Sequence, residues 1–298
     1  MVRVLIAVLV IPLGLDLYVP VPEENLITLE KIDLGRRLFH DRRLSRDQSV
    51  ACVSCHDPDR AFSTAEAVTP GVFGRRGKRN APALINRAWG RSFFWDARVG
   101  TLEEQVLQPI EDSKEMDLSI DEASRRVGVA VPDMSRALAT YIRSIMSGNA
   151  PYDRFVNGDR TALSAEAQIG LQVFRGKGNC SACHVGPNFT DEKLHNTGIA
   201  WAAAGTTGSF LDEGRGTITG RPEDRGAFKT PTLREIERSA PYMHDGSFAS
   251  LHEVVDYYDR GGNRHALLNP EVRPIGLTTS EKHALIAFLR SLSGNITR

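Results

Sequence analysis

The sequence predicts an all-α protein built as two tandem helical domains with long irregular loops. Its 298 residues suffice for two medium domains, each with a hydrophobic core of its own. Apolar residues recur at helical spacing in segments such as Ile120 to Met146. An internal repeat, described below, favours two related units over one large domain.

Composition and charge exclude several classes of protein. Hydrophobic residues make up 41% and charged residues 25% of the chain, which is typical of a folded protein and not of a disordered chain or a polytopic membrane protein. The 37 basic and 37 acidic side chains cancel. Phosphate binding requires a surplus of Lys and Arg on one face, so we expect no nucleic-acid partner.

The N-terminus resembles an export signal. Arg3 precedes an apolar run from Val4 to Leu15, which is shorter than the roughly 20 helical residues that cross a bilayer but suits a signal-peptide core. No small-x-small cleavage site follows. We expect residues 1–22 to be a signal peptide or an uncleaved N-terminal membrane anchor, with a buried strand as the remaining alternative. Export predicts a periplasmic protein.

The internal repeat appears when residue 82 is paired with residue 231 without gaps. The identical pairs are Pro82/Pro231, Leu84/Leu233, Asp96/Asp245, Leu102/Leu251, Glu104/Glu253 and Val106/Val255. A second echo pairs Gly35 to Phe39 with Gly170 to Phe174, both helical in pattern. We place the domain boundary near residues 146–153, which gives an N-terminal domain at 23–147 and a C-terminal domain at 148–298.

Two long helices and one irregular region can be placed. The helix over Ile120 to Met146 is interrupted near Pro132, and a second helix over Ser280 to Leu292 begins with a serine cap and ends at Gly294. The segment from Gly198 to Gly226 carries little periodic signal, so we expect a glycine-rich loop there.

The cysteines form two motifs. They read Cys52-Val53-Ser54-Cys55-His56 and Cys180-Ser181-Ala182-Cys183-His184, and they use every cysteine in the chain. The C-x-x-C-H pattern attaches c-type haem through two thiols and places the histidine on the iron. A single zinc site would not have this spacing and would leave both histidines unexplained. Redox disulfides would need a βαβ context that the sequence lacks. We therefore expect two covalently bound haem c groups.

The two haems differ in the ligands near them. After His56, the stretch from Asp57 to Arg79 contains no His and no Met, so the first haem lacks a nearby sixth ligand. An open iron position is what peroxide binding requires. The second half offers several candidates for closing its haem, and the residues alone do not decide among them: Met243, His244, His252, Tyr257 and Tyr258.

From about Leu34 to Leu292 the chain resembles the bacterial dihaem cytochrome c peroxidase and MauG family. The resemblance rests on both C-x-x-C-H motifs and on several shorter motifs. These are Leu34-Gly35-Arg36-Arg37-Leu38-Phe39, Arg79-Asn80-Ala81-Pro82, Phe94-Trp95-Asp96, Leu102-Glu103-Glu104-Gln105, Glu115-Met116, Phe228-Lys229-Thr230-Pro231, Ala240-Pro241-Tyr242-Met243-His244-Asp245-Gly246 and Gly261-Gly262. It implies two cytochrome c-like haem domains, the N-terminal one peroxidatic and the C-terminal one for electron transfer.

The resemblance also implies roles for residues around the first haem. Glu115 corresponds to the acid over the open haem face, where a carboxylate can move a proton between the two oxygens of peroxide. Gln105 resembles the second polar group of that pocket. Trp95 resembles the aromatic residue between the two haems.

A calcium ion between the domains is a further implication of the resemblance. Asn80 resembles its side-chain ligand, and Ser239 and Pro241 would contribute backbone carbonyls. Such an oxygen-rich set suits Ca²⁺.

Two departures from the peroxidase branch matter. Thr69 to Gly77 lacks the histidine that many peroxidases must move on reduction, so the protein should need no reductive activation. Tyr258 aligns where those peroxidases carry a Met on the second haem, as it does in MauG, and a phenolate favours ferric iron.

We therefore expect reduction of hydrogen peroxide with electrons from a small redox protein such as cytochrome c or a cupredoxin. One alternative is MauG-like oxidation of a partner protein. The other is a dihaem electron carrier without catalysis.

Overall fold

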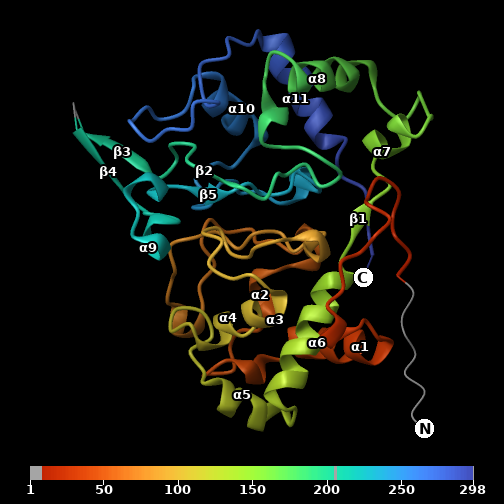
Figure 1. Cartoon of the computed structure of the whole chain (residues 1–298), viewed down its shortest axis with the longest axis vertical. Helices are drawn as coiled ribbons and strands as arrows, with labels where there is room; N and C mark the ends of the chain where they lie inside the picture. The colour runs from red at the N-terminus through yellow and green to blue at the C-terminus, as the bar shows by residue number, and fades with distance from the viewer. Residues whose placement is uncertain (1–8, 205–206, 298) are drawn as a thin grey trace.

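The computed structural model describes residues 9–204 and 207–297. It has two mainly helical halves stacked along the long axis of the molecule, with α1–α6 in one and α7–α11 in the other (Figure 1). The α-helices are α1 (Leu29–Phe39), α2 (Cys52–Cys55), α3 (Leu102–Gln105), α4 (Gln108–Glu111), α5 (Ile120–Val127), α6 (Val131–Ser144), α7 (Pro151–Val156), α8 (Ala165–Arg175), α9 (Gly216–Thr219), α10 (Leu251–Asp259) and α11 (Thr279–Arg290).

Short 3-10 helices punctuate the loops. They are η1 (Glu23–Asn25), η2 (Arg42–Leu44), η3 (Pro58–Arg60), η4 (Val72–Gly74), η5 (Arg87–Trp89), η6 (Cys180–Ala182), η7 (Pro222–Asp224) and η8 (Ile236–Arg238).

The expectation of an all-α fold holds only loosely. About 39% of the chain is helical, and the described residues also contain three two-stranded antiparallel sheets. These pair β1 (Ser147–Gly148) with β6 (Asn295–Ile296), β2 (Leu194–His195) with β5 (Phe228–Lys229), and β3 (Trp201–Ala204) with β4 (Thr207–Phe210). Strands of two to four residues are too short to leave an alternating pattern in the sequence. β3, β4 and α9 all lie in the region predicted to be a loop.

Each half is organised around one pair of closely packed helices, α1 on α6 and α8 on α11. A Cβ atom on Gly35 would lie 2.7 Å from Tyr141 Cβ, and one on Gly170 would lie 2.8 Å from Phe288 Cβ. Real Cβ atoms do not approach so closely, so glycine is required at both contacts. The two glycines occupy corresponding places in the repeated segments.

Two separate hydrophobic clusters follow from these helix pairs. The buried residues of the first fall between Leu38 and Ile145, and those of the second fall between Leu163 and Leu292.

The repeat is visible in the backbone as well. Asn86 and Glu235 are paired by the sequence repeat, and both have a left-handed φ, of 57° and 59°. Each begins the same arrangement of a 3-10 turn followed by an isolated β-bridge. The bridges are Phe93↔Val99 and Tyr242↔Phe248. Equivalent residues therefore occupy equivalent places in the two halves.

The two helices expected from the sequence both form, with altered ends. The first is divided: α5 ends before Gly128, which has φ of +73°, and α6 begins at Val131 with Pro132 in its first turn, where proline is tolerated. The cap of α11 is Thr278 and not Ser280, because the Thr278 hydroxyl accepts a hydrogen bond from the backbone N–H of Glu281 at 3.2 Å.

Residues 1–8 of the predicted export segment lie outside the described residues. The part that is described contacts both halves of the molecule. The carbonyl of Tyr18 accepts a hydrogen bond from Trp89 Nε1 of the first half at 2.8 Å, and that of Gly14 accepts one from Arg234 Nη2 of the second half at 2.9 Å. Over residues 9–204 and 207–297 no helix is long and apolar enough to cross a membrane.

Candidate functional site

Both C-x-x-C-H motifs open onto one cavity between the halves. This cavity has a volume of about 430 Å³, and its lining includes Cys55, His56, Cys180, Cys183 and His184. A smaller cavity of about 80 Å³ shares Cys55 and His56 with it and is also lined by Cys52. The structure thus places all four cysteines and both histidines of the motifs beside internal space.

The two motif histidines are held in the same way. His56 Nδ1 lies 3.0 Å from the carbonyl oxygen of Phe62, and His184 Nδ1 lies 2.9 Å from that of Phe189. A carbonyl accepts, so Nδ1 carries the proton and Nε2 keeps its lone pair. Burial lowers the pKa of both imidazoles, which favours this neutral form. Each Nε2 is therefore available to an iron, with Nδ1 anchored as is usual for metal-binding histidines.

None of the four cysteines, all of which lie within the described residues, is paired in a disulfide. Burial raises the pKa of Cys52 and Cys180 to about 12, and that of Cys55 and Cys183 to about 11. They are neutral and lie in largely apolar surroundings, as suits thioether bonds to haem. Two thiols, an oriented imidazole and an adjoining cavity in each half fit covalently attached haem c.

Glu115 and Gln105 lie together on the wall of the first haem site. Both line the two cavities, as does Pro109. Glu115 is open to the cavity and otherwise surrounded by protein, so removal from water and then the charge of Asp112 raise its pKa to about 7, against a smaller opposing effect of Arg98. A carboxyl group with such a pKa can both accept and donate a proton near neutral pH. Met116 also borders the smaller cavity, and it is a buried member of the hydrophobic core.

The candidate ligands of the second haem are separated by the structure. Tyr258 lines the cavity together with Met243 and His244. Tyr257 instead is buried, and its hydroxyl donates to the carbonyl of Thr197 at 2.9 Å. Burial raises the pKa of the Tyr258 phenol, and iron coordination would offset the cost of ionising it.

His252, the remaining candidate, is on the exposed side of α10. It meets the ring of His283 edge to face at 6.0 Å, so it lies away from the second haem site.

Trp95 and His244 face each other between the two halves. Their rings pack edge to face at 6.5 Å, and the Trp95 indole N–H donates to the carbonyl of Asn80 at 2.9 Å. The two residues are equivalent in the repeat, and their backbones are held reciprocally: Asn80 N–H donates to the His244 carbonyl and Lys229 N–H to the Trp95 carbonyl, both at 2.7 Å. Burial lowers the pKa of His244 to about 4, so this imidazole is neutral.

The three residues expected at a calcium ion line the same cavity. They are Asn80, Ser239 and Pro241. The Asn80 amide nitrogen donates to the carbonyls of Glu66 and Ala67 at 3.1 and 3.2 Å. Its side-chain oxygen therefore points away from these carbonyls, and a carboxamide oxygen fits a Ca²⁺ ligand.

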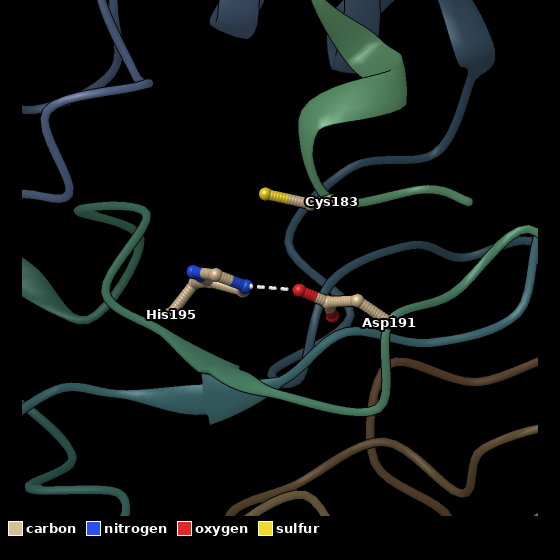
Figure 2. A group of neighbouring side chains, drawn as sticks. All are labelled: Cys183, Asp191 and His195. Carbon is tan, nitrogen blue, oxygen red and sulfur yellow. Dashed lines mark hydrogen bonds and ion pairs between the residues drawn. The ribbon is translucent and has the colours of Figure 1, made fainter.

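A polar group that the sequence analysis left without a role lies beside the second motif. Figure 2 shows Cys183 next to the pair formed by Asp191 and His195, whose Nε2 lies 2.8 Å from Asp191 Oδ2. Asn269 donates to His195 Nδ1 at 2.7 Å. The ligand atoms of Cys183, Asp191 and His195 lie within 4.8 Å of one another. The Cys183 thiol would be bonded to haem and would not be free to bind a metal ion. We therefore interpret these residues as part of the surroundings of the second haem and not as a metal site.

A second unpredicted group supplies positive charge to the cavity. Arg87 and Lys229 both line it and both contact Glu192, at 2.9 and 3.4 Å. Burial would raise the pKa of Glu192, but the two cations outweigh it and lower the pKa to about 2. Two cations against one carboxylate leave a net positive charge, which suits the propionates of a haem.

The chain resembles known di-haem proteins in sequence and in fold. The family profile of di-haem cytochrome c peroxidases matches residues 29–131. The methylamine utilization protein MauG of Methylorubrum extorquens is 37% identical over 293 residues, covering 92% of this chain and 81% of that protein. The cytochrome c551 peroxidase of Nitrosomonas europaea is 30% identical, covering 93% and 84%. The crystal structure of a MauG-like protein associated with microbial copper homeostasis matches with a TM-score of 0.86 and 32% identity, covering 94% of each chain.

Proposed function

Because this chain belongs to the di-haem cytochrome c peroxidase family of oxidoreductases, we propose that it cleaves hydrogen peroxide at the haem bound by Cys52, Cys55 and His56. The family carries two haems, and the second would be held by Cys180, Cys183 and His184. The observation that carries the proposal is Glu115, a carboxyl group on the cavity wall with a pKa raised to about 7. The named peroxidases among the relatives favour an enzyme over a non-catalytic electron carrier.

When bound, haem would supply an iron that can take up peroxide and electrons that can reduce it. The protein's own side chains would transfer the protons. Glu115 in its ionised form accepts a proton from one peroxide oxygen and returns it to the oxygen that leaves as water. Gln105, on the same wall, offers an amide that can hydrogen-bond to the bound peroxide. Trp95, which hydrogen-bonds to Asn80 and packs on His244 of the other half, is proposed to shorten the electron path between the two haems.

The electron source is proposed to be a small redox protein, cytochrome c or a cupredoxin. Tyr258 gives one observation in favour of a second function, the oxidation of residues in a partner protein. If this phenol binds the second iron, it stabilises the ferric state and makes that haem a poor acceptor of electrons from ordinary cytochromes. Oxidising equivalents would then persist long enough to be used on another protein. Either activity is proposed for the periplasm, where haem c proteins mature.

The decisive experiment is electron paramagnetic resonance of the purified ferric protein before and after peroxide. A high-spin component from the first haem that disappears on adding peroxide is expected. Two wholly low-spin haems whose spectra do not change on adding peroxide would refute the catalytic function. Adding reduced cytochrome c under turnover then separates the two candidates: rapid oxidation supports the peroxidase, and its absence favours a protein substrate.

A further inference from the structure

The turn from Gly71 to Arg75 packs directly on the backbone that carries Glu115. The N–H of Val72 donates to the carbonyl of Glu115 at 2.9 Å. Gly71 is buried, and a Cβ atom there would lie 2.7 Å from Glu115 Cα and closer still to the carbonyl oxygens of Lys114 and Glu115. Real Cβ atoms do not come that close, so only glycine permits this contact without displacing the Glu115 backbone.

The same turn holds a second point of that segment. Arg75 Nη1 donates to the carbonyl of Ser113 at 2.8 Å and pairs with Asp117 Oδ2 at 3.0 Å. The turn is closed on itself by the hydrogen bond from Gly71 N–H to the Arg75 carbonyl at 2.8 Å. One rigid turn therefore contacts residues on both sides of Glu115.

The Glu115 segment has little regular structure of its own. It runs between the end of α4 at Glu111 and the start of α5 at Ile120, and Asp117 adopts a left-handed φ of 50°. Its backbone hydrogen bonds are those of a turn, such as that from Glu115 N–H to the Asp112 carbonyl at 3.0 Å. The contacts with Gly71, Val72 and Arg75 add to this turn from outside and are suited to fix where the carboxyl group lies.

We infer that the turn from Gly71 to Arg75 positions Glu115 over the first haem, and that Gly71 makes this possible by lacking a side chain. Gly71 is a positioning residue and touches no substrate. The inference rests on the proposed function, because it assumes that Glu115 assists peroxide cleavage. Proton transfer is sensitive to placement, and a shift of about 1 Å can cost on the order of 10²-fold in rate.

The test is a double-mutant cycle with Gly71→Ala and Glu115→Gln in the protein carrying both haems. We expect Glu115→Gln to slow the peroxide step by roughly 10² to 10⁴-fold and Gly71→Ala to slow it by about 10- to 100-fold. The double variant should be no slower than Glu115→Gln alone, because a displaced Gln has no further proton transfer to lose. Gly100→Ala is the matched control: it adds the same methyl group in the same half, at a residue that does not line the cavity and where a Cβ would meet nothing within 4 Å.

The outcomes are distinguishable. If Gly71→Ala reacts at the wild-type rate while Glu115→Gln is slow, the positioning role is overturned and the proposed function stands. If Glu115→Gln itself reacts at the wild-type rate, the proposed role of Glu115 in peroxide cleavage is overturned, and the positioning role is overturned with it. A double variant slowed by the product of the two single effects would show a general disturbance and would also overturn the positioning role.

A milder pair of variants covers the case in which Gly71→Ala does not fold. Arg75→Gln removes the contacts with Ser113 and Asp117, whereas Arg76→Gln removes a pairing with Glu66 in the same loop. Slower peroxide cleavage in Arg75→Gln alone, with the rate no longer following the titration of Glu115, supports the inference. Equal rates and pH profiles in the two variants would overturn it.

Discussion

The pH dependence of peroxide cleavage gives the sharpest check on Glu115. The carboxyl group must be ionised to accept the first proton, and its pKa is raised to about 7. About one molecule in ten is then ionised at pH 6 and about one in a hundred at pH 5. The second-order rate constant with peroxide should therefore fall about tenfold for each pH unit below 7 and level off above it.

Stopped-flow absorption of the ferric protein with excess peroxide measures this rate constant across the pH range. Glu115→Gln should be slow and should lose the dependence on pH near 7. Asp112→Asn is a matched perturbation, because the Asp112 charge is the second cause of the raised pKa. The amide oxygen can still accept the hydrogen bond from Lys114 N–H, so the midpoint should move to lower pH while the plateau is kept. If Glu115→Gln retains the wild-type profile with the same midpoint, another group is responsible and the reasoning is wrong.

Tyr258→Phe should convert the second haem from low spin to high spin in the ferric state, and a low-spin variant would mean that another residue is the ligand. The control Tyr257→Phe should leave the haem spectrum unchanged and lower the free energy of unfolding by about 1 kcal/mol, because it loses a hydrogen bond. Gly170→Ala should destabilise the C-terminal half by about 1–3 kcal/mol or more, because the added methyl group meets Phe288, and thermal unfolding that matches the wild type would contradict this packing. Removal of calcium with a chelator should lower the melting temperature. The lost stability is about 2.7 kcal/mol if the free calcium concentration was a hundred times the Kd of the site. Asn80→Ala should abolish the difference, and a melting temperature that does not depend on calcium would count against the site.

The parts of the site that lie within one short stretch were predictable from the sequence. The two C-x-x-C-H motifs are contiguous, so their spacing alone indicated haem attachment. The role of Glu115 could not be predicted from the residues next to it in the sequence, because acidic residues near helix ends are common. It was predicted from the family resemblance. The raised pKa of Glu115 depends on the cavity and on Asp112, and only the fold shows these together.

Other features were invisible because they join distant residues. Asn269 hydrogen-bonds to His195, which lies 74 residues earlier in the chain, and no local pattern marks either residue. The same is true of the contact between Gly71 and Glu115. The cap of α11 was misplaced by two residues because Thr278 and Ser280 are both suitable hydroxyl residues, and the choice is made by which one meets the N–H of Glu281.

The two halves share most of their backbone plan, so the proposed difference between their haems is to be sought at equivalent places in the repeat. Extending the pairing of residue 82 with residue 231 along the chain sets Pro109 against Tyr258, and both line the cavity. Tyrosine offers an oxygen that can bind iron, whereas proline has no side-chain donor or acceptor. The helix that carries Tyr258 runs unbroken from Leu251 to Asp259, but its counterpart is divided into α3 and α4, and the chain after α4 brings in Glu115. If Tyr258 closes the second iron, the proline at the equivalent place and the broken helix would leave the first iron open, as the proposed function requires.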